Sequence, residues 1–282
     1  MKPSRFVPAL TLVLACFGAI AQDVYLSEQL TKKWETPSSL LTPESVLSDV
    51  AGNVIYVANI NGQPSVKDGN GFISKISTSG KIINLKWING LDAPKGMGIY
   101  KGRLFVTNIT EVAEISIAEG KIVKRYPAAG SSFLNDISVS PIGIVYISDS
   151  QKGVIFKLEN GKIEKWIEGL EGVNGLLCSG KDILLVGTKN SVVQILTTNK
   201  LQTTLISDTG GIDGLVSCGK NKFLYSDWSG SVYQATVDEG KKLILNTSKA
   251  KINAADIDYI PSEHLLLVPT FFDNRVMAYE LK

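Results

Sequence analysis

The chain has 282 residues, of which 44% are hydrophobic and 20% are charged, which suits a folded protein with a substantial core and not a disordered segment. Its 29 Lys and Arg residues nearly balance its 27 Asp and Glu residues, and no basic tract is present, which argues against nucleic acid or an anionic membrane surface as a partner. Glycine is abundant, with 26 residues, and helical periodicity is scarce, so we expect many short strands joined by tight turns.

The first 21 residues have the pattern of a secretory signal peptide. Lys2 and Arg5 precede an apolar run over residues 7–20, and an A-x-A site ends at Ala21, directly before Gln22. The run is too short and wrongly flanked for a membrane span. We therefore expect a secreted or periplasmic protein without a membrane span.

The mature chain that this signal predicts covers residues 22–282. It is close to neutral, because cleavage removes two of the 29 basic residues and none of the 27 acidic ones. A lipoprotein signal that would anchor the chain at Cys16 is disfavoured, since a bulky Leu stands at the second position of that motif and the A-x-A site lies downstream.

A repeating unit of about 40 residues runs through the mature chain. It opens on a polar residue before a short apolar strand, and Asn135, Asn174 and Asp213, which open three successive units, are spaced 39 residues apart. A near-continuous apolar run follows, as in residues 54–60, and then an alternating strand, as in residues 72–77, a tight turn and a fourth strand. This period is typical of a β-propeller with four-stranded blades.

Six such units follow one another. Their apolar second strands cover residues 54–60, 104–109, 144–150, 183–188, 223–228 and 265–270. Turns near residues 80, 120, 161, 200 and 240 each precede a fourth strand, but the chain stops at Lys282, where a sixth is due. The segment LTKKWE at residues 30–35 resembles those fourth strands. We therefore predict an all-β, six-bladed propeller whose last blade is completed by this N-terminal strand, the alternative being an unpaired arm.

The residues that open the six units are called the motif residues below: Glu44, Lys95, Asn135, Asn174, Asp213 and Ala255. The first interval is long because an insertion, residues 61–71, enlarges the first blade. Inner strands of a propeller line its central channel, so equivalent residues converge at one mouth of that channel. Two carboxylates and two amides there form an all-oxygen set that suits a hard divalent cation. The alternative is that each side chain bonds nearby backbone ends.

Four of these motifs, PES with Glu44, LND with Asn135, NGL with Asn174 and DGL with Asp213, resemble the senescence-marker-protein/gluconolactonase (regucalcin-like) family of six-bladed propellers over the whole mature chain. The resemblance implies that Glu44, Asn174 and Asp213 bind one divalent cation, Ca²⁺ as first choice and Mg²⁺, Mn²⁺ or Zn²⁺ as alternatives. Asn135 would lie beside it and contact water or ligand. The family implies an enzyme that hydrolyses a small lactone or ester, a sugar lactone among the candidates, with Asp213 as general base.

Lys95 departs from that pattern, because a positive side chain among the motif residues opposes a metal ion. Three roles stay open for it: a catalytic contact with a substrate carboxylate or oxyanion, a pairing with Glu44 that weakens cation binding, and a solvated lysine at the channel mouth. The second role would leave a non-catalytic propeller that binds a small ligand or a protein partner, which is the main alternative to an enzyme. A strictosidine-synthase-like activity is a further alternative, for which no catalytic acid is visible.

Other residues are weaker candidates for a functional role. His264 is the only histidine and is expected in a hairpin away from the motif residues, which excludes a Ser-His-Asp triad and a His-rich zinc site. Cys178 and Cys218 occupy near-equivalent positions on successive blades, so we expect two small buried residues, with a disulfide as the alternative. Loops on the face of the motif residues contribute side chains that are candidates for pocket walls or for packing: Lys67, Asp68, Trp228, Phe271, Phe272 and Asp273.

Overall fold

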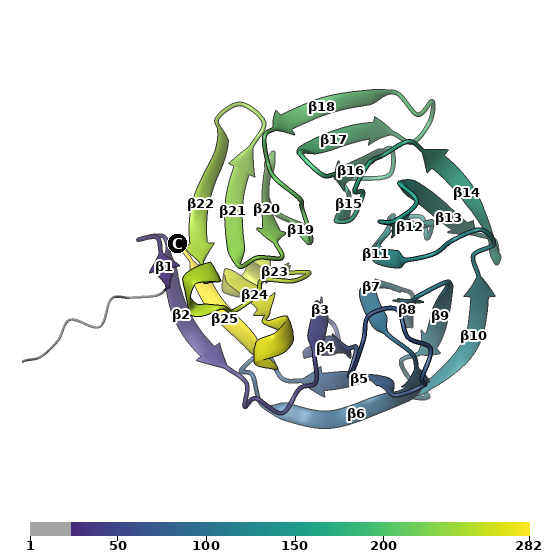
Figure 1. Ribbon diagram of the computed structural model, residues 1–282, viewed down its shortest axis with the longest axis horizontal. Coiled ribbons are helices and arrows are strands. Elements are labelled where there is room, and N and C mark those ends of the chain that lie inside the picture. The colour runs from purple at the N-terminus through teal and green to yellow at the C-terminus, as the bar shows by residue number, and fades with distance from the viewer. Residues whose placement is uncertain (1–23) are drawn as a thin grey trace, which may run out of the picture.

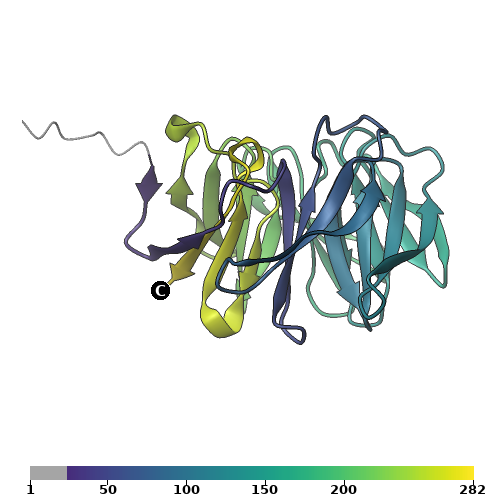
Figure 2. The same ribbon diagram turned by 90° about the horizontal axis from the view of Figure 1, so that it is seen from below.

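The computed structural model describes residues 24–282, so the expected signal peptide and its cleavage site lie outside the described residues. Residues 24–282 form six antiparallel sheets arranged as a ring (Figure 1). Seen from the side, the sheets stand next to one another with their connecting loops gathered at two opposite faces (Figure 2). The prediction of a six-bladed β-propeller is confirmed.

The first three blades have four strands each, which run in chain order from the channel outward. Blade one contains β3 (Pro43–Asp49), β4 (Val54–Asn59), β5 (Gly71–Ile76) and β6 (Ile82–Leu91). Blade two contains β7 (Pro94–Tyr100), β8 (Arg103–Asn108), β9 (Glu111–Ser116) and β10 (Lys121–Pro127). Blade three contains β11 (Leu134–Val139), β12 (Val145–Asp149), β13 (Val154–Glu159) and β14 (Lys162–Glu168).

The last three blades are also ordered from the channel outward. Blade four contains β15 (Leu176–Cys178), β16 (Ile183–Gly187), β17 (Ser191–Leu196) and β18 (Gln202–Ser207). Blade five contains β19 (Leu215–Gly219), β20 (Lys222–Asp227), β21 (Ser231–Thr236), β22 (Gly240–Asn246) and an added outer strand, β1 (Tyr25–Leu26). Blade six contains β23 (Asp258–Ile260), β24 (Leu265–Pro269), β25 (Val276–Leu281) and β2 (Leu30–Glu35).

The N-terminal strand closes the ring as predicted. β2 pairs with β25, with Leu30 opposite Leu281, so strands from the two ends of the described chain share blade six. At the channel the Asp256 N–H donates to the Glu44 carbonyl over 2.9 Å, which joins blades six and one. The strand β1 was not predicted, because two residues are too few to form a pattern in sequence.

The apolar core lies between neighbouring blades. In β4, Ile55 and Val57 pack against blade six, whereas Tyr56 and Ala58, which alternate with them, pack against blade two. A second strand is therefore buried on both faces, which explains its near-continuous apolar sequence. Each such side chain contributes about 1.5–3 kcal/mol when fully buried, so the blade interfaces hold the ring together.

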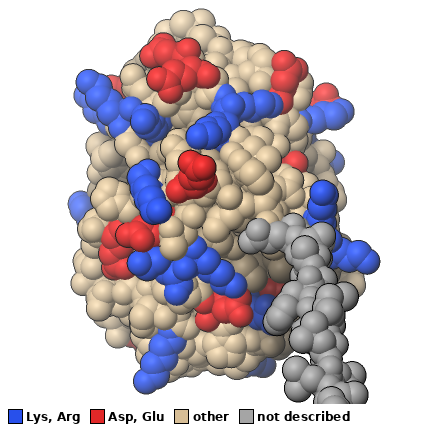
Figure 3. Space-filling model, turned by 90° about the vertical axis from the view of Figure 1, so that its left-hand side faces the viewer, with Lys and Arg blue, Asp and Glu red and all other residues tan. Residues whose placement is uncertain are grey.

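Short 3-10 helices mark the two faces of the ring. η2 (Pro261–Glu263) and η3 (Phe271–Asp273) precede and follow β24, so they lie at opposite faces, while η1 (Ser248–Ala250) lies on the face of η3 (Figure 2). None of the helices in residues 24–282 has the length and apolar composition to cross a membrane. On the side formed by β1, β2 and β22, basic and acidic side chains are interspersed (Figure 3).

The two cysteines of the described chain are both free thiols. Cys178 and Cys218 are partly buried and pack in the interfaces of different blade pairs. Burial raises the pKa of Cys178 to about 11, so this thiol stays protonated near neutral pH. We expected two small buried residues; the structure has two unpaired cysteines that are partly buried, and the disulfide alternative is not seen.

Candidate functional site

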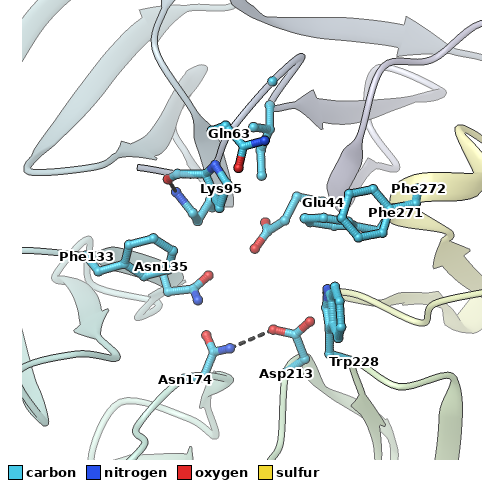
Figure 4. Close-up of a pocket in the computed structure, with 13 residues that line it drawn as sticks. Glu44, Gln63, Lys95, Phe133, Asn135, Asn174, Asp213, Trp228, Phe271 and Phe272 are labelled. Carbon is cyan, nitrogen blue, oxygen red and sulfur yellow. Dashed lines mark hydrogen bonds between the residues drawn. The ribbon is translucent and has the colours of Figure 1, made fainter. Parts of the chain in front are cut away.

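Five of the six motif residues line one pocket of about 460 Å³ at the mouth of the channel (Figure 4). The second residues of the inner strands β3, β7 and β11 are Glu44, Lys95 and Asn135, and the turns just before β15 and β19 supply Asn174 and Asp213. The sixth, Ala255, is instead buried in an apolar cluster that includes Ile60 and Phe271. The structure thus brings the five polar motif residues together, while their chemical roles remain predictions.

Polar residues that end the second strands hold the loops that enter the inner strands. Asn108 Oδ1 accepts hydrogen bonds from the Asp92 and Ala93 N–H groups, at 2.8 and 3.1 Å, just before Lys95. The Asp149 carboxylate likewise accepts hydrogen bonds from the N–H groups of Ser132 and Phe133, just before Asn135. Asn108 and Asp149, which end β8 and β12, are therefore positioning residues for Lys95 and Asn135.

Glycine follows the motif residue where neighbouring inner strands approach most closely. A Cβ atom at Gly214 would lie 2.4 Å from the Ile257 backbone nitrogen, and one at Gly96 would lie 2.5 Å from Asp136 Cα. Neither contact leaves room for a methyl group, and both obstacles are backbone atoms. The K-G and D-G pairs in the sequence thus reflect how tightly the blades pack around the channel.

The polar ends of four motif residues, Glu44, Asn135, Asn174 and Asp213, face one common space (Figure 4). Asn174 Nδ2 donates to Asp213 Oδ1 over 2.6 Å. Among the residues that line the pocket, three buried oxygen atoms have no hydrogen-bond partner within residues 24–282: Glu44 Oε2, Asn174 Oδ1 and Asp213 Oδ2. Each belongs to a residue that the sequence predicts as a cation ligand. Within the described chain no cluster of three His, Cys, Asp or Glu side chains could hold a metal, so a cation here would depend on the Asn174 amide as well.

Burial disfavours the charged forms of both carboxylates at this site. It raises the pKa of Glu44 well above its usual range, and the nearby Asp213 adds to the rise, while Lys95 opposes it. Burial likewise raises the pKa of Asp213 to about 7, with the Asn174 hydrogen bond pulling in the other direction. Positive charge placed in this space would therefore stabilise the ionised forms.

Lys95 is not solvated, so that reading of the sequence was wrong. Its side chain is only 1% exposed, and Nζ donates to the carbonyls of Pro64 and Ala93, at 2.9 and 3.1 Å. Nζ also lies 4.4 Å from the centre of the Phe133 ring. Burial lowers its pKa to about 8, while the charge of Glu44 opposes that change. Lys95 therefore fastens the insertion, through Pro64, to the pocket wall.

Aromatic side chains form much of the remaining pocket wall. Trp228, Phe271 and Phe272 line it as the sequence suggested, whereas Lys67, Asp68 and Asp273 do not. Instead, Lys67 bonds Thr110, Asp68 bonds Asn70 and Asp273 bonds Arg275. Sequence reasoning missed further lining residues: Ile60, Gly62, Gln63, Pro64 and Phe133. The length of the insertion, residues 61–71, was the available signal for several of them.

A second set of buried carboxylates lies deeper in the channel and was also missed. Asp136 and Asp256 line a cavity of about 160 Å³. Asp136 accepts from the Leu176 N–H over 2.5 Å, and Asp256 accepts from Ser45 Oγ over 2.6 Å. Burial raises the pKa of both carboxyl groups well above their usual range. Their contacts within the chain make these residues part of the blade junctions.

His264 lies away from the pocket, as predicted. It follows η2 with a positive φ of 51°, at the start of β24, whereas the pocket residue Phe271 follows the end of that strand. The two residues thus belong to opposite faces of the ring. His264 is the single histidine of the sequence, and it is not among the residues that line the pocket.

Solved structures of similar fold include two lyases. A catalytically inactive virginiamycin B lyase variant from Staphylococcus aureus with quinupristin is 15% identical, with a TM-score of 0.64 over 90% of this chain and 99% of that one. A streptogramin B lyase is 14% identical, with a TM-score of 0.65 over 92% and 98%. The extracellular domain of a hybrid two-component system from B. thetaiotaomicron is 14% identical, with a TM-score of 0.55 over 84% of this chain and 33% of that chain.

These likenesses establish the fold alone. At identities of 14–15%, they do not assign an activity to this chain. No protein-family profile matches the sequence, and a comparison with curated proteins finds no match either. The class that fold and pocket define is a six-bladed β-propeller with polar side chains converging at one mouth of its channel.

Proposed function

We propose that the chain is a divalent-cation-dependent hydrolase that opens a small lactone or ester. The observation that supports this most is the convergence of three buried oxygens without partners in the described chain, on Glu44, Asn174 and Asp213. A buried acceptor left unpaired costs about 1–3 kcal/mol, and a charged one more. A cation that takes all three oxygens as ligands removes that cost, and oxygen is the ligand that hard cations prefer.

Ca²⁺ is our first choice, with Mg²⁺, Mn²⁺ or Zn²⁺ as alternatives. The likeness of the PES, LND, NGL and DGL motifs to the gluconolactonase-like family supports the same three ligands and the same chemistry. When bound, the cation would act as a Lewis acid on the substrate carbonyl and favour negative charge on its oxygen.

Asp213 is the proposed base for the attacking water. Its Oδ1 is held by Asn174, which leaves Oδ2 without a partner in the described chain. Burial raises the pKa of Asp213 to about 7 without a cation, and a bound cation would lower it, so the carboxylate would be ionised near neutral pH and able to accept a proton from water. The water oxygen bonds to the acyl carbon, the acyl carbon–oxygen ester bond breaks, and the proton held by Asp213 passes to the leaving alkoxide. A lactone thus becomes a hydroxy acid.

Asn135 and Lys95 have supporting roles in this proposal. The Asn135 side chain lines the pocket beside the proposed ligands, where its amide can bond the attacking water or the substrate carbonyl. Lys95 Nζ donates two hydrogen bonds to the backbone carbonyls of Pro64 and Ala93. In this proposal Lys95 therefore acts through its charge and by holding Pro64 in place. Its positive charge favours a developing oxyanion but competes with a cation for Glu44.

Hydrolysis by a carboxylate base suits this pocket better than an activity that needs histidine. The solved virginiamycin B lyase is a catalytically inactive variant in which a histidine is replaced by alanine. The only histidine here, His264, lies on the face opposite the pocket. A propeller that binds a small ligand without turnover remains the alternative, and the burial of Lys95 beside Glu44 is the observation that favours it.

The test is turnover of a panel of lactones and esters, with quinupristin included, by the Ca²⁺-loaded protein in water enriched in ¹⁸O. Hydrolysis predicts a hydroxy acid that carries one oxygen from water, whereas ring opening by elimination adds none. Asp213→Ala should lose turnover and Ca²⁺ binding together, and Glu164→Gln, on an exposed outer strand, should keep both. Unchanged turnover in Asp213→Ala contradicts the proposal. Bound Ca²⁺ without any turnover favours the binding protein.

A further inference from the structure

The pocket is polar at one end and apolar along its walls. Apart from the five motif residues, its lining consists of Ile60, Gly62, Gln63, Pro64, Phe133, Trp228, Phe271 and Phe272. Gln63 and the indole N–H of Trp228 are the only side-chain groups among these able to make strong hydrogen bonds. Away from the motif residues, a ligand in this pocket therefore finds few side-chain partners for its polar atoms.

Three aromatic rings form one wall as a packed cluster. Trp228 lies 5.5 Å from Phe271 and 6.0 Å from Phe272, and the two phenylalanines lie 4.8 Å apart, measured between ring centres. The ring planes meet at 78°, 81° and 89°, which are the edge-to-face arrangements that aromatic rings prefer. The cluster comes from blades five and six and faces the space above Glu44 and Asp213 (Figure 4).

The wall includes a residue with a strained backbone and two exposed side chains. Phe271 has a φ of 50°, a left-handed conformation that costs a bulky residue about 1–3 kcal/mol. Phe272 is 66% exposed and Trp228 is 44% exposed, so large apolar side chains stand open to solvent at the rim. Burial of these surfaces would be a source of binding energy for an apolar ligand.

A sugar lactone does not suit these walls. Any hydroxyl group that lies against these walls below the rim would leave water for a surface of aromatic and aliphatic carbon, and a hydroxyl buried without a partner costs about 1–3 kcal/mol. An aromatic ring placed there instead gains edge-to-face contacts with Trp228 and Phe272. The volume of about 460 Å³ lies in the usual range for small organic ligands.

We propose that the substrate is an apolar lactone or ester that bears an aromatic ring, with its carbonyl at the motif residues and its ring against Trp228, Phe271 and Phe272. The reaction in this inference rests on the proposed function. The class of ligand rests on the pocket walls. It replaces the sugar lactone that the family resemblance suggests.

The test compares three δ-lactones with the Ca²⁺-loaded protein: dihydrocoumarin, which has a fused aromatic ring, unsubstituted δ-valerolactone, and glucono-δ-lactone. We expect kcat/KM, divided by the rate of uncatalysed hydrolysis of each lactone at the same pH, to fall in that order, by about tenfold or more from first to last. Trp228→Ala and Phe272→Ala should each lower kcat/KM for dihydrocoumarin about tenfold, mainly through KM, and leave δ-valerolactone nearly unchanged. Ile142→Ala, which removes an exposed apolar side chain from a distant hairpin, should change nothing.

Binding of two lactams, which are not hydrolysed, separates the two proposals. Isothermal titration should detect 3,4-dihydro-2-quinolinone, the lactam of dihydrocoumarin, and not gluconolactam. If no lactone is turned over while this binding difference holds and is lost in Trp228→Ala, the hydrolase proposal fails and the ligand class stands. The inference is overturned if glucono-δ-lactone is the best substrate, if gluconolactam binds at least as well, or if Trp228→Ala leaves the preference intact.

Discussion

Asn174 donates a hydrogen bond from Nδ2 to Asp213 Oδ1 over 2.6 Å, which links blades four and five at the mouth of the channel. The bond fixes both side chains so that the second oxygen of each, Asn174 Oδ1 and Asp213 Oδ2, is buried without a partner in the described chain. One contact therefore orients two of the three proposed cation ligands.

Asn174→Ala should weaken Ca²⁺ binding by about tenfold or more, because it removes one ligand and the group that orients another. It should also raise the pKa of Asp213 in the metal-free protein, since the lost hydrogen bond favours the carboxylate. Titration calorimetry measures the first effect, and carboxyl ¹³C NMR against pH measures the second. Unaltered affinity together with an unaltered pKa would mean that Asn174 has no such role.

Lys95→Met should bind Ca²⁺ more tightly than the wild type, by roughly five- to tenfold, because it removes a buried positive charge that acts on Glu44. Methionine keeps much of the packing but releases the Pro64 carbonyl. We therefore also expect faster hydrogen exchange in residues 61–71. Lys67→Met, on the same insertion but outside the pocket, is the matched control for the Ca²⁺ affinity. Weaker Ca²⁺ binding in Lys95→Met would contradict this role for its charge.

Gly214→Ala should destabilise the fold by about 1–3 kcal/mol, because the new methyl group would lie 2.4 Å from the Ile257 nitrogen. Gly211→Ala is the matched control: it lies three residues earlier, and a Cβ there meets no atom within 4 Å. Its free energy of unfolding should stay within about 0.5 kcal/mol of the wild type. Urea denaturation measures both variants, and equal midpoints would argue against close packing of the inner strands.

Stability of the metal-free protein should fall as pH rises from about 5 to 8. Burial raises the folded-state pKa of Asp136 and Asp256 above the unfolded value of about 3.9, so the folded state binds more protons. Their contribution to stability is full below the unfolded pKa and is lost as pH rises through the folded pKa. Urea midpoints in EDTA should decrease over this range, and less steeply in Asp256→Asn. A midpoint that rises with pH would contradict this expectation.

Much of the fold could be predicted because its signal is repeated. A position that recurs about every 40 residues marks the start of an inner strand, and LTKKWE resembles the fourth strands closely enough to indicate that it completes blade six. The apolar second strands are recognisable because both of their faces are buried between blades. β1 could not be foreseen, since two residues carry no periodicity.

The pocket could be predicted only where it depends on the repeat. Repeat equivalence brings Glu44 and Asp213 together, but it does not reveal what each side chain touches. The burial of Lys95 depends on the carbonyl of Pro64 in an insertion that has no counterpart in other blades. The place of Phe133 on the wall and the partner of Asp256 likewise follow from contacts between blades.

The most direct test of this account is the stoichiometry of Ca²⁺ binding to protein stripped with EDTA, measured by titration calorimetry in the wild type and in Glu44→Gln and Asp213→Ala. We predict one Ca²⁺ per chain in the wild type, and affinity reduced at least about a hundredfold in each variant, because each loses a charged ligand. Wild-type protein that binds no divalent cation, or variants that bind Ca²⁺ as the wild type does, would contradict the assignment of Glu44, Asn174 and Asp213 as a cation site.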